Sequence, residues 1–260
     1  MRAMSKPDYR HHGAKQRRRR SSSSRAVAAQ SLADFPGAIC ARCEKPNSLC
    51  VCDAVTPIDN RIAVLILQHP QEQDKLLGSA RLAALHFANA ALRVGLSWQS
   101  LGKALGASAG AKMPSDPKRW AILYLGAARA ADLPKGREVV ALDSKGRPEA
   151  DQNAALKGID GIVLFDGTWS QAKTLWWRNP WVLKARRIAL APNKPSRYGV
   201  LRREPRGEGL STLEAAAFAV ARLESRPEIE VALVESFERM LAKYRMAKRA
   251  LKEKPAPPPP

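Results

Sequence analysis

Five short apolar runs stand out in the middle of the chain, and polar residues hardly interrupt them. They are IAVLILQ (62–68), WAILYL (120–125), EVVALD (138–143), GIVLF (161–165) and RRIAL (186–190). A strand that is buried on both faces has this pattern, because helices cover both sides of a parallel sheet. The runs therefore predict a buried and mostly parallel β-sheet.

Helical periodicity occupies much of the chain between and after these runs. Residues 79–94 have apolar side chains at helical spacing, which predicts a helix with Leu82, Leu85, Ala88 and Leu92 on one face. Three more helices are predicted, at 169–177, 212–225 and 228–252. Strands that alternate with helices predict an α/β fold with helices on both faces of the sheet.

The two ends of the chain do not share this pattern. Residues 1–37 are poor in apolar side chains and contain RRRRSSSS at 17–24, so we expect a disordered basic tail. Residues 253–260 form a proline-rich tail. A start that is rich in Arg and Ser is also typical of organelle transit peptides, and the pattern alone leaves that alternative open.

The charge of the chain points to a candidate partner. The net charge is +20; residues 1–25 hold nine Lys or Arg and one acid, Asp8, so the remaining residues carry +12. The body of the chain is therefore basic as well as the tail, and a nucleic-acid backbone is the simplest partner. An anionic membrane surface is the alternative, although no basic amphipathic helix with bulky anchors supports it. No apolar run approaches the roughly 20 residues of a membrane span, so we expect a soluble, cytoplasmic protein.

All four cysteines lie in one segment, CARCEKPNSLCVC, as Cys40, Cys43, Cys50 and Cys52. Four thiolates so close together suit a tetrahedral zinc site, and the Pro-Asn-Ser turn at 46–48 can bring the two pairs together. Such a site leaves no position open for a substrate, so the predicted zinc is structural. Two disulfides and unligated or redox-active thiols are the alternatives, but without a secretion signal we expect reduced thiols.

Polar motifs follow two of the predicted strands. QHPQE (68–72) ends the first strand, and DGTW (166–169) follows the most apolar one. In open α/β sheets ligands bind beyond the carboxyl ends of the strands, so both motifs are candidate sites. Thr168 and Gln171 have the spacing of a helix capping box, which leaves Asp166 without a capping role. Asp166 is therefore a candidate site residue, while a purely structural role stays open for Asp166 and for His69.

Two later segments carry further candidate groups. KPSRYGVLRREP (194–205) interleaves basic residues with a tyrosine, which fits the binding of nucleic acid or a carboxylate; a solvated basic loop is the alternative. LSTLEA (210–215) contains a second capping box, Ser211 with Glu214, and a helix start of this kind could also hold an anionic group. Of the tryptophans at 169–181 we expect most in the core, and one could stack on a base.

The order and spacing of these motifs resemble the DTW-domain family, which includes the tRNA-uridine aminocarboxypropyltransferases. Asp166, Thr168 and Trp169 match the D-x-T-W motif of that family, and the resemblance covers residues 39–223. Ser79 stands where the family pattern has Thr, but both residues carry a hydroxyl group.

The resemblance implies a fold and a reaction. The fold would be similar to the SPOUT class, with a C-terminal trefoil knot that holds S-adenosylmethionine. The reaction would transfer the 3-amino-3-carboxypropyl group to N3 of a tRNA uridine, in the variable loop, and release methylthioadenosine. The expected organisation is a basic tail at 1–37, a small four-cysteine zinc element at 38–58, an S-adenosylmethionine-binding catalytic domain at 59–227, a basic helix at 228–252 and a proline-rich tail at 253–260.

The resemblance also implies roles for individual residues. Asp166 is the candidate base for the N3 proton, and His69 and Glu72 are less favoured candidates. The residues expected at the donor site are Gln68, Thr168, Trp169, Ser196, Tyr198, Arg202, Leu210, Ser211, Thr212 and Glu214. Of these, Arg202, Ser211 and Thr212 would hold the donor's carboxylate, and Glu72 or Glu214 its ammonium group. The basic surface and the N-terminal tail would hold tRNA phosphates.

Two other functions stay open at the level of sequence. A SPOUT-type RNA methyltransferase would share the donor and the fold but would transfer the methyl group. A non-catalytic, zinc-containing RNA-binding protein would need only the charge and the cysteines. The sequence is compatible with a monomer and with a homodimer.

Overall fold

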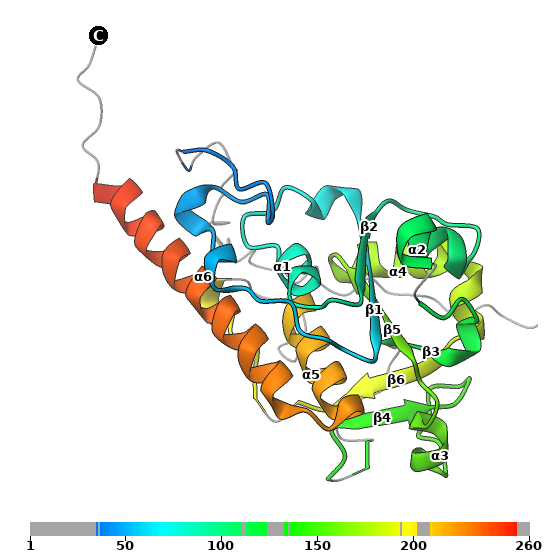
Figure 1. Ribbon diagram of the computed structural model, residues 1–260. Coiled ribbons are helices and arrows are strands. Elements are labelled where there is room, and N and C mark those ends of the chain that lie inside the picture. Colours follow the sequence, from blue (N-terminus) through cyan, green and yellow to red (C-terminus); the bar gives the residue numbers. More distant parts are fainter. Residues whose placement is uncertain are drawn as a thin grey trace, which may run out of the picture. The chain divides into compact units, whose positions relative to one another are not determined.

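A six-stranded sheet forms the centre of the computed structural model (Figure 1). Its strands lie in the order β2-β1-β5-β3-β6-β4. The strands are β1 Ala63–Gln68, β2 Ala90–Val94, β3 Trp120–Leu123, β4 Val139–Leu142, β5 Gly161–Asp166 and β6 Arg186–Leu190. Each of the five apolar runs contains a strand, and the predicted α/β fold is confirmed.

The structure describes residues 35, 37–110, 113–123, 133–134, 136–192, 194–201 and 209–253. All of them belong to one unit, Ser31–Pro260. The predicted basic and proline-rich tails fall almost wholly outside the described residues, so both stay predictions.

Most strands of the sheet run parallel. The pairs β1–β2, β1–β5, β3–β5 and β3–β6 are parallel, and β4 at the edge pairs antiparallel with β6. The register between β1 and β5 places Gln68 opposite Asp166, and all six residues of β1 are buried. The last residues of these two strands therefore lie side by side at one edge of the sheet.

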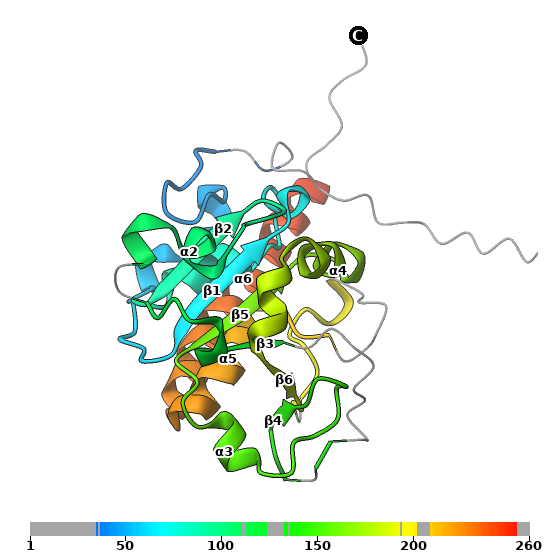
Figure 2. The same ribbon diagram turned by 90° about the vertical axis from the view of Figure 1, so that its right-hand side faces the viewer.

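Helices cover both faces of the sheet, as predicted. The helices are α1 Ala80–Leu85, α2 Leu101–Gly110, α3 Gln152–Leu156, α4 Trp169–Arg178, α5 Thr212–Glu224 and α6 Pro227–Glu253. Successive side chains of a strand point to opposite faces, so Val64 and Ile66 of β1 share an apolar cluster with residues of α1, α5 and α6, whereas Leu65 and Leu67 share another with residues of α2 and Trp176 of α4. Figure 1 shows the strands between these two sets of helices, and Figure 2 views the sheet from the side of α2 and α4.

The prediction of a single helix over residues 79–94 is wrong. Helix α1 ends at Leu85, and the edge strand β2 begins at Ala90. The side chain of Asn60 exchanges hydrogen bonds with the backbone of Asn89, which fixes the turn between the two elements. Most of β2 is half-buried, so its apolar residues fit the stripe of a helix as well as an edge strand, and only pairing with β1 decides between them.

Two short or irregular helices, α2 and α3, were not predicted. Helix α2 is interrupted at Gly106, whose φ of 76° is not helical, and α3 has only five residues. Neither segment offers enough regular turns for a clear apolar stripe.

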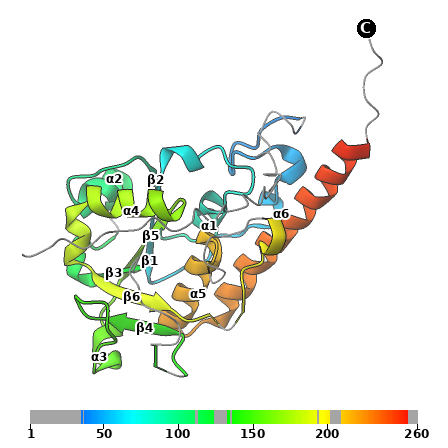
Figure 3. The same ribbon diagram turned by 180° about the vertical axis from the view of Figure 1, so that it is seen from behind.

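The cysteine-containing segment packs against the long helix α6, as Figure 3 shows from behind. Leu49 and Tyr244 lie in one apolar cluster, and the ring of Tyr244 stacks on that of Phe35 with centroids 5.8 Å apart. The ammonium group of Lys243 donates a hydrogen bond to the carbonyl of Cys50. None of the described helices is long and apolar enough to cross a bilayer.

Candidate active site

The carboxyl ends of β1 and β5 bring Gln68 and Asp166 together. The Gln68 Nε2 atom donates a hydrogen bond of 2.8 Å to Asp166 Oδ2. Both side chains are buried, with exposed fractions of 4% and 6%. A buried carboxylate requires hydrogen-bond partners, and the strand pairing supplies the first one.

Helix α5 supplies the second partner of Asp166. The Thr212 hydroxyl, in the first turn of α5, donates to Asp166 Oδ1 over 2.5 Å. Both partners are distant in the chain: Gln68 lies 98 residues away and Thr212 lies 46 residues away. Strand pairing and helix docking thus hold the carboxylate in one orientation.

The turn after β5 needs glycine at position 167. A Cβ atom there would lie 2.9 Å from Cβ of Gln171, which is closer than real Cβ contacts. The predicted capping box is confirmed: the Thr168 hydroxyl accepts from the Gln171 N–H, and Gln171 Oε1 accepts from the Thr168 N–H. Thr168 and Trp169 follow Gly167; Thr168 is exposed and Trp169 is half-buried, so both reach the surface close to Asp166 in the chain.

His69 and Glu72 lie in or beside a single 3-10 turn, Pro70–Glu72, that follows β1. The N–H of His69 donates to the backbone carbonyl of Asp166 over 2.9 Å, and its half-buried ring accepts from the N–H of Gln71. Glu72 is buried. The backbone of His69 is therefore held beside Asp166.

A second polar cluster forms around Glu214. Its carboxylate accepts from the Ser196 hydroxyl at 2.6 Å, from the Arg197 N–H at 2.7 Å and from the Ser211 N–H at 2.9 Å. The last contact, with the return bond from the Glu214 N–H to the Ser211 hydroxyl, confirms the second capping box. Glu214 thus fixes the loop around Ser196 to the start of α5.

Three further residues expected at the donor site differ in their surroundings. Tyr198 is buried, packs edge-on against Phe237 and donates from its hydroxyl to the Leu77 carbonyl. Leu210 is half-buried, and Arg202 lies outside the described residues. The Tyr198 contacts give it a clear part in packing the loop, and a contact with a ligand stays a prediction.

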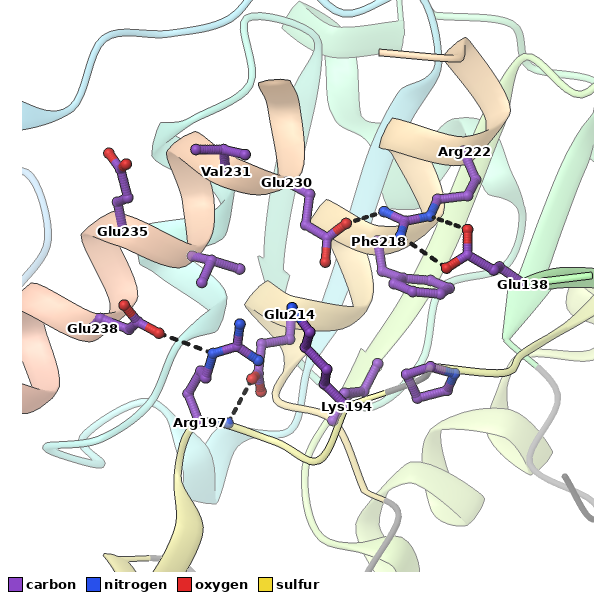
Figure 4. Close-up of a pocket in the computed structure, with 13 residues that line it drawn as sticks. Glu138, Lys194, Arg197, Glu214, Phe218, Arg222, Glu230, Val231, Glu235 and Glu238 are labelled. Atoms are coloured by element: carbon purple, nitrogen blue, oxygen red, sulfur yellow. Dashed lines mark hydrogen bonds and ion pairs between the residues drawn. The ribbon is translucent and has the colours of Figure 1, made fainter. Parts of the chain in front are cut away.

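A pocket of 510 Å³ lies between the Ser196 loop, α5 and α6 (Figure 4). Ion pairs cross its walls: Arg222 binds Glu138 and Glu230, and Arg197 binds Glu238. The hydrogen bonds between Arg222 and Glu138 lower the pKa of this carboxyl group. The pocket is large enough for a small organic ligand, and its rim is polar with mostly paired charges.

Lys45 was not predicted as part of this region. Its side chain is buried, and the ammonium group donates to the Leu76 carbonyl over 2.7 Å. Burial lowers the pKa of Lys45 to about 8, and the nearby charges of Cys43 and Asp166 oppose this decrease. The sequence gives no signal for it, because a lysine between two cysteine pairs normally lies at the surface.

The four cysteines form one cluster, as predicted. Their sulfur atoms all lie within 4.8 Å of one another and are free thiols, with Cys43 and Cys52 buried. A hydrogen bond from the backbone N–H of Cys43 lowers the pKa of Cys40 to about 6, which favours a thiolate there. Four sulfur ligands at this separation could hold a metal ion, because a small contraction gives tetrahedral coordination.

Fold and site together define an α/β protein that has a polar site at the carboxyl edge of a parallel sheet and a four-cysteine element. A profile of the DTW domain matches residues 37–245. The chain therefore belongs to the DTW-domain family.

Several proteins of similar sequence are named as tRNA-uridine aminocarboxypropyltransferases. The chain is 31% identical over 210 residues, 80% of its length and 74% of the relative, to tRNA-uridine aminocarboxypropyltransferase 2 of Drosophila melanogaster. It is 28% identical over 234 residues, 84% of its length and 71% of the relative, to the protein of the same name from Macaca fascicularis. It is 25% identical over 219 residues, 78% of its length and 79% of the relative, to tRNA-uridine aminocarboxypropyltransferase A of Arabidopsis thaliana. No solved structure gives a significant match.

Proposed function

We propose that this protein is a tRNA-uridine aminocarboxypropyltransferase. It would transfer the 3-amino-3-carboxypropyl group of S-adenosylmethionine to N3 of a uridine in the variable loop. Family membership and the names of the relatives support the class of reaction and the tRNA substrate. Within the structure, one observation carries the proposal: the buried carboxylate of Asp166 is held in one orientation at the edge of the sheet where ligands bind.

The reaction sets clear requirements for this site. The bond between sulfur and the γ-carbon of the donor breaks, a bond from that carbon to uridine N3 forms, and methylthioadenosine leaves. The N3 proton must be removed, and Asp166 is the proposed base. Three carbons surround the sulfonium, so the site must present one of them to N3, and rigid side chains such as Asp166 and Thr212 favour such orientation.

The donor would bind beside this edge. Ser211 and Thr212 at the start of α5, with Arg202, are the proposed partners of its carboxylate, because the N-terminal end of a helix favours negative charge. Glu214 accepts three hydrogen bonds, two of them from Ser196 and Arg197 of the loop, so we assign it to holding the loop, where Tyr198 also acts. The 510 Å³ pocket next to this loop supports a small-molecule ligand.

We also propose a zinc ion and a SPOUT-like knot. Zinc bound by Cys40, Cys43, Cys50 and Cys52 would stabilise the segment that packs on α6, and with four protein ligands it would take no part in the reaction. The parallel order β5-β3-β6 supports a SPOUT-like sheet. Residues 124–132 and 202–208 lie outside the described residues.

The first test replaces Asp166 by Asn and measures both products by mass spectrometry. We expect the rate of methylthioadenosine release and of uridine modification to fall about 10²- to 10⁴-fold, because a positioned base contributes that much. Binding of S-adenosylmethionine, followed by calorimetry, should persist. Formation of S-adenosylhomocysteine and a methylated base by the unaltered protein would instead establish a methyltransferase.

A matched control lies at the other end of the same strand. Asp160 precedes β5 and forms an ion pair with Arg119, so Asp160→Asn should keep its turnover. If Asp166→Asn also keeps full turnover with normal donor binding, the base is another group, and His69→Asn and Glu72→Gln become the variants to measure.

A further inference from the structure

Helix α4 exposes an aromatic and basic stripe. The α4 stripe consists of Trp169, Lys173 and Trp177, which are spaced by four residues and therefore lie along one side of the helix. The Lys173 Nζ atom lies 5.5 Å from the centre of the Trp169 ring. Trp177 is 76% exposed, more than any other large apolar side chain in the described part of the chain.

Other residues of α4 attach the helix to the protein. Ala172 and Leu175 are buried, and Trp176 packs edge-on against Phe165 of β5 with ring centroids 6.1 Å apart. Trp177 therefore contributes little to the core. Large aromatic side chains are normally mostly buried, so an indole ring left in water is a candidate binding group.

The segment of the chain that contains the stripe carries positive charge only. From 167 to 203 the chain contains nine Lys or Arg and no acid. Among the described residues, no carboxylate forms an ion pair with Lys173, Arg178 or Lys184. By contrast, Arg197 and Arg222 are paired with carboxylates of the pocket wall. Lys173 and Arg178, which form no ion pair among the described residues and share a helix with an exposed indole ring, complement a polyanion that carries stacking bases.

We propose that the α4 stripe binds unpaired nucleotides of the RNA substrate, with Trp177 stacking on a base and Lys173 and Arg178 facing phosphates. The inference rests on the proposed function, because it takes tRNA as the ligand. Helix α4 begins three residues after Asp166, and Trp177 lies about 12 Å further along it at 1.5 Å per residue. The stacked base is thus a neighbour of the target uridine and not the target itself.

The test compares RNA binding by the full chain and its variants. The probes are a fluorescein-labelled, unmodified tRNA transcript and a fully paired RNA duplex, measured by fluorescence anisotropy over a series of salt concentrations. Trp177→Ala should weaken tRNA binding about 5- to 150-fold, the range for one stacked base, and leave duplex binding unchanged. Because this variant keeps every cation, the slope of log K against log salt should not change.

Three companion variants identify the cause of the effect. Trp177→Phe should restore most of the affinity, because it keeps an aromatic face. Lys173→Gln should lower the salt slope by about 0.7 to 0.9, the value for one phosphate. Met246→Ala removes an apolar side chain that is 73% exposed on another helix, and it should change neither affinity nor slope.

The outcomes separate this proposal from the proposed function. Three results would each contradict RNA binding by the α4 stripe. They are equal tRNA affinity for Trp177→Ala and the unaltered protein, equal losses of affinity for tRNA and duplex, and no RNA binding by the unaltered protein. The last result would point to a protein partner. Binding needs neither donor nor turnover. If the protein binds tRNA through Trp177 but transfers no group to it, RNA binding by the α4 stripe is supported and the proposed transferase activity is contradicted.

Discussion

At the residue scale, the buried polar side chains of this protein differ in whether they have hydrogen-bond partners. Asp166, Gln68 and Glu214 are buried and form hydrogen bonds with distant parts of the chain. His86 is different: it is 2% exposed, and neither ring nitrogen has a hydrogen-bond partner among the described residues. A buried imidazole without a partner is easier to keep neutral than charged.

The environment of His86 predicts a pH-dependent loss of stability. Burial lowers the pKa of His86 to about 4 in the folded protein, against about 6.5 in the unfolded chain. Between these values only the unfolded state binds the proton, so the free energy of unfolding falls as pH decreases from 6.5 toward 4. The loss is about 1.4 kcal/mol per pH unit, or about 3 kcal/mol in total.

Urea unfolding at pH 7, 6 and 5 checks this expectation. In His86→Leu the contribution disappears, so the free energy of unfolding should depend on pH less steeply by about 1.4 kcal/mol per unit. Parallel curves for the two proteins would show that the imidazole is not buried in its neutral form.

At the scale of elements, the four-cysteine segment and α6 stabilise each other. Leu49 and Tyr244 share an apolar cluster, and Lys243 binds the Cys50 carbonyl. Metal binding to such a segment adds directly to folding stability. If the proposed zinc ion is bound, its loss should therefore also loosen the end of α6.

Metal content and melting temperature test this coupling. We expect about one zinc ion per chain by elemental analysis, and none in Cys43→Ser. The melting temperature of the variant should be at least about 5 °C lower. Each kcal/mol lost from the free energy of unfolding lowers the melting temperature by about 2–4 °C in a chain of this size. Ser48→Ala, in the same segment, should keep both the zinc and the melting temperature. An unaltered protein without metal, or a variant with unchanged melting, would contradict the proposed role.

The elements also show what the sequence could and could not predict. The buried strands were predictable because β1 and β5 are apolar on both sides, and the two helix starts because each capping box is local. Strand β2 was mistaken for part of a helix, because a half-buried edge strand is defined by its neighbour. Asp166 was found as an unexplained acid, but its partners Gln68 and Thr212 could not be derived from spacing. No local pattern in the sequence predicted that Lys45 is buried near this site.

At the scale of the whole molecule, positive charge extends over the tail and the body. Residues 1–25 contain nine of the 44 Lys and Arg residues. If the tail binds tRNA phosphates, deletion of these residues should lower the salt slope of tRNA binding by about 0.7 to 0.9 for each phosphate that the tail neutralises. Replacing the nine cations by Gln at full length should have the same effect, because the slope depends on charge and not on chain length.

Anisotropy titrations of labelled tRNA at several salt concentrations measure that slope. The deletion should leave transfer at saturating tRNA unchanged, because Asp166 and its partners lie far along the chain. An unchanged slope would remove the tail from the tRNA-binding surface and favour the transit-peptide alternative for it.

The pairing of Gln68, Asp166 and Thr212 also has a consequence for biosynthesis. These three residues belong to segments separated by 98 and 46 positions in the chain, and contacts of such long range form slowly. During translation the nascent chain exposes β1 well before β5 and α5 exist, so its apolar edges lack their partners for much of synthesis. The site is thus completed only late in translation, and chaperones are expected to matter more for its yield than for its final stability.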